Sequence, residues 1–308
     1  MASPAQSFRS HNRRWIVTAI PYLWMLVFFL VPFFIVLKIS FSLSEIAQPP
    51  YAPVFDIIAD SWDETLDKLS LLTSDNYLRL IQDSIYSSSY LSSLWIAGSS
   101  TVMMLFIAYP IAYGMARAPK SWRPTLVMMV ILPFWTSFLI RVYAWIAILS
   151  DEGLLNYALT SLGLIDEPLQ ILSTNTAVYI GILYSYLPFM VLPLYSNLEK
   201  MDDSLIEAAK DLGCTQIEAF WRVTFPLSLP GVIAGCFLVF IPAVGEFVIP
   251  DLLGGSDTIM IGKTMWEEFF NNRDWPAASG VAIALLILLM IPIMIFQANE
   301  ARQQEAGR

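Results

Sequence analysis

Long apolar runs alternate with short polar segments along the whole chain. Six runs are long enough to cross about 30 Å of hydrocarbon as helices that rise about 1.5 Å per residue. They cover residues 16–39, 90–116, 125–149, 174–198, 227–250 and 276–296. Strands are excluded, because six strands are too few and these runs too long for a closed barrel. The pattern therefore predicts an all-α integral membrane protein with six membrane-spanning helices.

The placement of Lys and Arg predicts the orientation of these helices. With a cytoplasmic N-terminus, the inside segments hold eleven Lys and Arg, whereas the outside loops hold four. Because basic residues are enriched on the cytoplasmic side, we expect cytoplasmic tails at residues 1–15 and 297–308 around a membrane domain at 16–296. The basic start resembles a signal peptide, but the following apolar run is long enough to span, so a retained first helix is expected.

Composition agrees with a membrane location. Hydrophobic residues make up 56% of the chain and charged residues 14%, against about 45–50% and about 25% in soluble domains. The net charge of −9 is uneven, because the outer loops 40–89, 150–173 and 251–275 carry seventeen acids and four bases, a difference of −13. Such a field would concentrate cations at the outer mouth; the alternative is that the acids only keep these loops soluble.

The first outer loop, residues 40–89, contains two amphipathic segments at residues 56–72 and 75–86. Their apolar residues recur at helical spacing. We expect two short helices, which either dock another subunit or pack against the protein's own helices.

Residues that carry catalytic chemistry are scarce. The chain has two cysteines, Cys214 and Cys236, and one histidine, His11, so no metal-ligand set can be assembled. A Gly-rich phosphate loop and a nucleophile elbow are also missing. We therefore expect neither an enzyme nor a bound cofactor nor a nucleic-acid partner, and any ATP hydrolysis must come from another chain.

The inside loop at residues 199–226 has strong local signals. Ser204 and Glu207 have the spacing of a capping box, as do Thr215 and Glu218, and Gly213 lies between the two. The loop therefore predicts two short helices joined by a sharp glycine turn, with Pro226 interrupting the second. Apolar residues would line these helices, which suggests an interface with a soluble partner or a hairpin that covers the protein's own spans: Leu205, Ala208, Ala209, Leu212, Ile217, Phe220 and Trp221.

The same loop resembles the EAA motif of ABC-importer permeases. The matching residues are Glu207-Ala208-Ala209, then Gly213, then the segment from Val223 to Pro226, between the fourth and fifth of six predicted spans. Residues 133–145, 187–195, 242–255 and 269–276 resemble permeases of spermidine/putrescine importers, with most likeness to the first permease subunit of the putrescine system. The resemblance implies the type I ABC-importer permease fold and coupling of an ATPase through Glu207, Ala208, Ala209, Gly213, Ile217 and Phe220.

The resemblance also implies partners and a function. Expected partners are a second homologous permease, a cytoplasmic ATPase dimer that holds ATP and Mg, a periplasmic or lipid-anchored polyamine-binding protein, and the lipid of a bacterial inner membrane. ATP-driven alternating access would then import putrescine, with spermidine as a further substrate. Two alternatives are an ABC importer for another solute and an ion-coupled secondary transporter, which would leave the EAA-like loop unexplained.

Two ionisable residues, Arg141 and Glu246, fall within predicted spans, where a charge costs at least about 2.5 kcal/mol. Pro242, Gly245 and Pro250 predict a kink or break around Glu246. Glu246 would either contact an ammonium group of the polyamine or pair with Arg141 or with an Arg of the second permease. Aromatic residues that could hold an ammonium by cation–π contact, or else form membrane-belt and packing contacts, are Trp135, Tyr143 and Tyr186.

Overall fold

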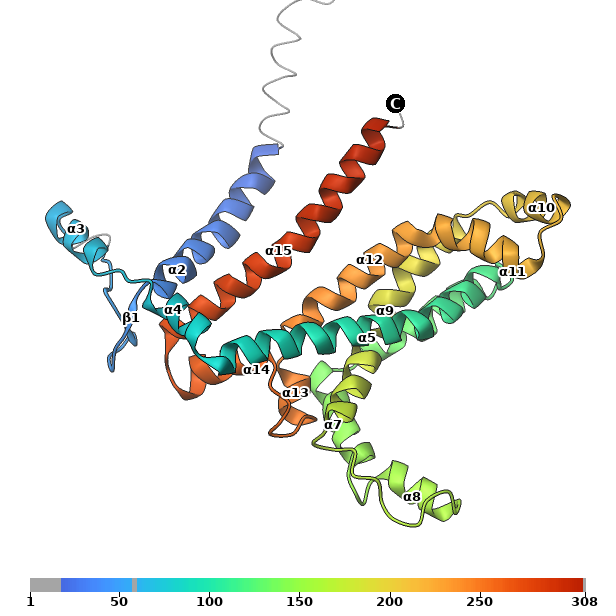
Figure 1. The fold of residues 1–308 in the computed structure, drawn as a ribbon, viewed down its shortest axis with the longest axis horizontal. Coiled ribbons are helices and arrows are strands. Elements are labelled where there is room, and N and C mark those ends of the chain that lie inside the picture. The colour runs from blue at the N-terminus through green and yellow to red at the C-terminus, as the bar shows by residue number, and fades with distance from the viewer. Residues whose placement is uncertain (1–17, 57–59, 307–308) are drawn as a thin grey trace, which may run out of the picture. The chain divides into compact units, whose positions relative to one another are not determined.

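A computed structural model describes residues 18–56 and 60–306, which divide into two compact units (Figure 1). Unit 1 combines the chain up to Asp83 with the chain from Met265, and unit 2 runs from Ser84 to Thr264. The predicted tail at residues 1–15, the start of the first span and Ile57 and Ile58 of the outer loop lie outside the described residues.

Unit 1 is built on two long helices that lie side by side (Figure 1). The first, Thr18–Ser40, contains a π-helical turn, η1 (Leu26–Leu30), followed by α2 (Val31–Ser40). The second, α15 (Trp275–Ala306), continues beyond the predicted end of the last span at residue 296. The remaining elements are the antiparallel pair β1 (Leu43–Ser44) and β2 (Tyr51–Ala52), α3 (Trp62–Ser70), α4 (Asp75–Gln82) and the π-helical turn η4 (Glu267–Asn271).

The loop at residues 40–89 packs in part against the protein's own helices. The amide nitrogen of Asn76 in α4 donates to the carbonyl oxygens of Ser40 and Ser42, at 2.9 and 2.8 Å, where α2 ends. Arg79 forms an ion pair of 2.9 Å with Asp274, whose carboxylate also accepts the N–H of Ala277 in α15. Helix α4 therefore holds the ends of α2 and α15 together, which is one of the two arrangements expected for this loop.

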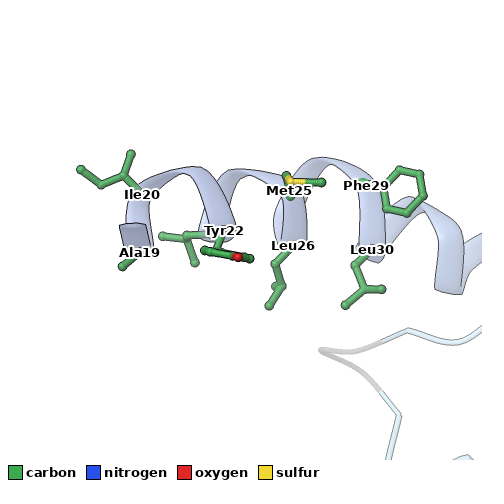
Figure 2. A pocket seen from close by; sticks show the side chains of 8 residues that line it. Ala19, Ile20, Tyr22, Met25, Leu26, Phe29 and Leu30 are labelled. Carbon is green, nitrogen blue, oxygen red and sulfur yellow. The ribbon is translucent and has the colours of Figure 1, made fainter. Parts of the chain in front are cut away.

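The first half of the Thr18–Ser40 helix presents an open apolar hollow on its surface (Figure 2). Tyr22 supplies a hydroxyl group, and no charged side chain lines the hollow. Ile20 and Phe29 are 67% and 60% exposed. This surface offers contact area for lipid or another apolar helix. Its lining is Ala19, Ile20, Tyr22, Leu23, Met25, Leu26, Phe29 and Leu30.

Unit 2 has its core where α5, α9 and α12 pack against one another (Figure 1). Met104, Met190 and Leu194, one from α5 and two from α9, are fully buried there. The elements of this part of the chain are α5 (Ser84–Arg117), α6 (Arg123–Ile131), η2 (Leu132–Trp135), α7 (Phe138–Leu149), α8 (Leu154–Ser161), α9 (Asn175–Glu199), α10 (Ser204–Asp211), α11 (Gln216–Ala219), η3 (Phe220–Thr224), α12 (Phe225–Val244), α13 (Val248–Leu252) and α14 (Ile261–Trp266).

Within the described residues, five helices are long and apolar enough to cross a membrane. They correspond to five of the six predicted spans: Thr18–Ser40, Ser84–Arg117, Asn175–Glu199, Gln216–Val244 and Trp275–Met294. The third predicted span differs, because it consists of two helical pieces, Arg123–Trp135 and Phe138–Ser161, bent by 87°. The break follows a 3₁₀ turn that contains Pro133 and ends at Thr136 in extended backbone (ψ 152°).

Candidate coupling surface and membrane pathway

The loop at residues 199–226 forms the predicted glycine turn, but its first helix starts differently. Helix α10 has Asp203 at its N-cap, so the capping box predicted for Ser204 and Glu207 is wrong. Instead, a carboxylate oxygen of Asp202 accepts the N–H of Ser204 at 3.0 Å. That hydrogen bond lowers the pKa of Asp202 below its ordinary value, because it stabilises the charged carboxylate. After α10, Gly213 has φ +89°, a conformation that favours glycine.

The second helix continues into the membrane domain. The predicted capping box of Thr215 and Glu218 is present. The predicted interruption at Pro226 is wrong, because one helix runs from Gln216 to Val244. The π-helical turn η3 precedes Pro226 and widens the helix where proline lacks an N–H and its ring needs room. A continuous helix therefore joins the glycine turn to the predicted fifth span.

The predicted docking residues divide into two groups. Glu207 and Ala208 are exposed, and Leu212 and Ile217 are 87% and 73% exposed. Apolar side chains this exposed at one turn indicate an interface. Ala209, in contrast, is buried.

Phe220 is half-buried and turns toward the protein's own helices. Its ring makes edge-to-face contacts with Tyr109 and Tyr113 of α5, at centroid distances of 5.7 and 5.9 Å. Arg117, at the end of α5, also forms an ion pair with Asp203 beside α10. Phe220 and the Arg117–Asp203 pair therefore connect the loop to α5 within this chain. A docking role for Ala209 and Phe220 stays a prediction.

The fifth predicted span is broken around Glu246. Helix α12 ends at Val244 and α13 begins at Val248. One carboxylate oxygen of Glu246 accepts the backbone N–H groups of Phe247, Val248 and Ile249, at 3.2, 3.0 and 3.3 Å. Glu246 is 7% exposed and therefore stabilises the start of α13 from within the protein.

The other oxygen of Glu246 accepts a hydrogen bond from the hydroxyl of Tyr186 on α9. The structure thus brings together two of the four pathway candidates, one from α9 and one from the break between α12 and α13. Trp135 and Tyr143 are 71% and 56% exposed in this chain, so they are available to lipid or to another subunit.

Arg141 does not pair with Glu246 in the described structure. Its guanidinium lies over the rings of Phe134 and Phe138, at 4.9 and 5.7 Å from their centroids. The residue is 9% exposed, and its Nε and Nη1 atoms have no hydrogen-bond partner among the described residues. The predicted pair of Arg141 with Glu246 is therefore not formed among the described residues, and Glu246 instead accepts hydrogen bonds from Tyr186 and from the start of α13.

Gly262 of α14 packs directly on the backbone that carries Glu246. A Cβ atom at this position would lie 2.6 Å from the carbonyl oxygen of Glu246 and would also overlap that of Gly245. Because both obstacles are backbone atoms, we expect Gly262→Ala to displace the segment and destabilise the protein by about 1–3 kcal/mol. Thermal unfolding of the purified protein would measure this as a lower Tm.

Two helical glycines serve as matched controls. Gly98 and Gly114 in α5 have open space where a Cβ would be added. We expect Gly98→Ala and Gly114→Ala to leave Tm unchanged or raise it slightly, because alanine loses less backbone entropy in a helix. An unchanged Tm for Gly262→Ala would contradict the close approach.

Comparison with known proteins now decides the family. A family model described as "Binding-protein-dependent transport system inner membrane component" matches residues 11–302. The chain belongs to this family. It is thus an inner-membrane component of a transport system, which confirms the predicted class of transporter subunit.

Two curated relatives match most of the permease. It is 40% identical to the "Spermidine/putrescine transport system permease protein PotB" of Haemophilus influenzae over 286 residues, 92% of this chain and 93% of the relative. It is 44% identical to the protein of the same name from Escherichia coli K12 over 226 residues, 73% of this chain and 82% of the relative. The predicted likeness to spermidine/putrescine permeases is confirmed. The finer prediction, a first permease of the putrescine system, was imprecise, because these relatives are PotB proteins.

A solved structure confirms the fold. The permease matches a chain of a bacterial ABC transporter involved in the import of the acidic polysaccharide alginate, with a TM-score of 0.68 and 15% identity. The match covers 97% of the permease and 99% of that chain. The predicted ABC-importer permease fold is therefore confirmed, whereas the solute is a separate question.

Proposed function

We propose that the chain is the permease subunit of an ATP-driven polyamine importer. The observation that carries this proposal is the single helix Gln216–Val244, which joins the exposed glycine turn to the break that holds Glu246. The names of the PotB relatives, at 40% and 44% identity, support spermidine and putrescine as the substrate class. The acidic outer loops suit a cationic solute better than an anionic one.

The transporter would be a complex of several chains. Its parts are a second homologous permease, two copies of a cytoplasmic ATPase that bind ATP and Mg²⁺, and a periplasmic or lipid-anchored polyamine-binding protein. Both termini of this chain would face the cytoplasm. The dependence of the family on a binding protein supports this composition, as does an alginate importer solved in complex with a periplasmic protein.

ATP would act on this chain through the exposed segment from Leu212 to Ile217 around Gly213, which we call the coupling turn. Closure of the ATPase dimer moves Gly213 and its exposed neighbours as a unit. The continuous helix carries this motion to Val244, while Phe220 and the Arg117–Asp203 pair transmit it to α5. The membrane helices then exchange inward-facing and outward-facing arrangements, and the free energy for the exchange comes from ATP on the partner.

Glu246 fits the role of a buried cap beside the pathway better than that of an ammonium ligand. One of its oxygens already accepts three backbone N–H groups, and the other accepts the hydroxyl of Tyr186. We expect Glu246→Gln to keep an acceptor for α13 and to hold putrescine uptake within about threefold of wild type. Glu246→Ala should instead leave buried donors unsatisfied, at about 1–3 kcal/mol each, and reduce the amount of folded complex.

Uptake kinetics and membrane levels of the two Glu246 variants separate the possible roles. A normal level of Glu246→Gln with a putrescine KM raised about tenfold, equivalent to about 1.4 kcal/mol, would contradict the capping role and favour direct contact with an ammonium group.

Co-purification tests the transporter class. Affinity isolation of this chain from membranes should recover an ATPase and a second permease, and the preparation should hydrolyse ATP. An ion-coupled secondary transporter predicts a preparation without an ATPase. Recovery of the chain alone, with uptake that a proton or sodium gradient drives, would contradict the proposed function.

A further inference from the structure

The outer hairpin at residues 150–173, which we call the acidic knob, is held in one shape from within. Asn156 of α8 is 2% exposed, and its amide donates to the carbonyl oxygens of Ser150 and Leu169 at 3.2 and 2.9 Å. The Asn156 side-chain oxygen accepts the N–H of Leu169 at 2.9 Å. Gly163 ends α8 with φ +67°, and Leu164 donates to the carbonyl of Leu159 at 3.0 Å. The knob is therefore preorganised.

Large apolar side chains stand exposed on this rigid frame. Leu154 and Tyr157, one turn apart on α8, are 68% and 73% exposed, and Leu162 and Leu164 are 73% and 66% exposed. Figure 1 shows α8 beyond the end of α7, away from the packed helices of unit 2. A fixed structure that presents four such side chains at a loop indicates a binding surface, because a solvated loop gains nothing from their exposure.

The rim of the acidic knob carries one sign of charge. Asp151, Glu152, Asp166 and Glu167 are all exposed, and residues 150–173 contain no Lys, Arg or His. None of these four carboxylates forms an ion pair with another described residue. Helices that lie on anionic membranes carry Lys and Arg on their polar face, so the acidic rim argues against a lipid surface as the occupant.

We propose that the acidic knob is a docking surface for the importer's substrate-binding protein, which would offer an apolar recess with a basic rim. This inference rests on the proposed function, because it requires a binding protein that works with this permease. An apolar centre within a charged rim is the usual anatomy of a protein interface. The unpaired carboxylates would speed encounter with a basic partner and set its orientation.

Charge reversal tests the rim in the complete transporter, reconstituted in nanodiscs with its purified binding protein. The ATPase rate is measured against binding-protein concentration. We expect Glu152→Lys with Asp166→Lys to raise the half-saturating concentration about tenfold, with an unchanged maximal rate, and to weaken its salt dependence. The matched control is Asp63→Lys with Asp67→Lys, which reverses two exposed acids on α3 and should leave the half-saturating concentration unchanged.

The outcomes distinguish a failure of the proposed function from a failure of the docking surface alone. A wild-type complex that the binding protein never stimulates would overturn the proposed function. Normal stimulation with equal half-saturating concentrations in wild type, knob variant and control would overturn the docking surface alone. The two double variants carry the same change in net charge, so an equal weakening in both would also count against the knob.

A photo-cross-linking residue at Tyr157 tests the occupant directly in the same complex. We expect light to join Tyr157 of this chain to the binding protein, identified by its mass, and to yield no such product from Phe106, which is 76% exposed on α5. Cross-links from position 157 to lipid or to the second permease would overturn the proposal, because they would assign the knob a different neighbour.

Discussion

Replacing Gly213 by proline is expected to abolish ATP-driven uptake while leaving the chain in the membrane. Gly213 has φ +89°, whereas the proline ring fixes φ near −65°. The turn between α10 and α11 cannot form with that ring. Motion of the ATPase would then no longer be transmitted to the helix that reaches Val244. We expect uptake to fall about 100-fold, because coupling between distant sites typically changes an equilibrium by about 5- to 150-fold. Uptake in cells and immunodetection in membranes measure the two effects separately.

Asparagine at the same position is the matched control. Asn tolerates the left-handed conformation better than other non-glycine residues, and a Cβ atom at Gly213 would meet no other atom within 4 Å. We therefore expect Gly213→Asn to retain most of the uptake. Full uptake by the Gly213→Pro variant would show that the conformation of this turn does not matter for coupling.

Charges placed on the exposed coupling turn are expected to remove the ATPase from the complex. Leu212 and Ile217 are 87% and 73% exposed on either side of Gly213. Truncation of an anchor at the centre of an interface costs about 2 kcal/mol or more, and a buried unpaired carboxylate costs more again. Leu212→Asp with Ile217→Asp should therefore prevent co-purification of the ATPase, with little effect on the folding of this chain.

An aspartate in a loop that is expected on the opposite side of the membrane serves as the control for this experiment. Leu66 of α3, in the first outer loop, is 57% exposed. Because that loop is expected outside, Leu66→Asp should leave the amount of bound ATPase unchanged. Retention of the ATPase by the double variant at the coupling turn would contradict the assignment of that turn as the docking surface.

Much of the fold follows from the sequence because the bilayer restricts the choice of structure. Backbone groups in hydrocarbon must form hydrogen bonds internally, so long apolar runs such as residues 174–198 and 276–296 become helices. The direction in which a helix runs is encoded less strongly in the sequence than its length. The 87° bend between Arg123–Trp135 and Phe138–Ser161 arises from extended backbone after Pro133, and an apolar run gives no measure of that angle.

The coupling turn is predictable from the sequence where its structure depends on residues that are close together along the chain. Gly213 needs a left-handed conformation, and Thr215 caps its helix through contacts within three residues. Ser204 has the same apparent signal, but Asp202 accepts its N–H instead. The continuation through Pro226 depends on a π-helical turn, which has no reliable sequence pattern.

The membrane site was predicted only as a set of residues. Tyr186 and Glu246 are 60 positions apart, so their hydrogen bond depends on how α9 packs against the broken fifth span. Periodicity places each residue on its own helix but says nothing of such pairs. The expected pairing of Arg141 with Glu246 rested on opposite charge, whereas the carboxylate accepts backbone N–H groups one to three positions along the chain.

ATP-dependent uptake of radiolabelled putrescine and spermidine tests the central claim most directly. The cells would lack this chain and every other polyamine importer, and would be complemented with wild type or with Gly213→Pro. We expect wild type to restore uptake and Gly213→Pro to fail at a normal membrane level. Unchanged uptake of both polyamines with and without the wild-type chain would contradict its assignment as a polyamine permease.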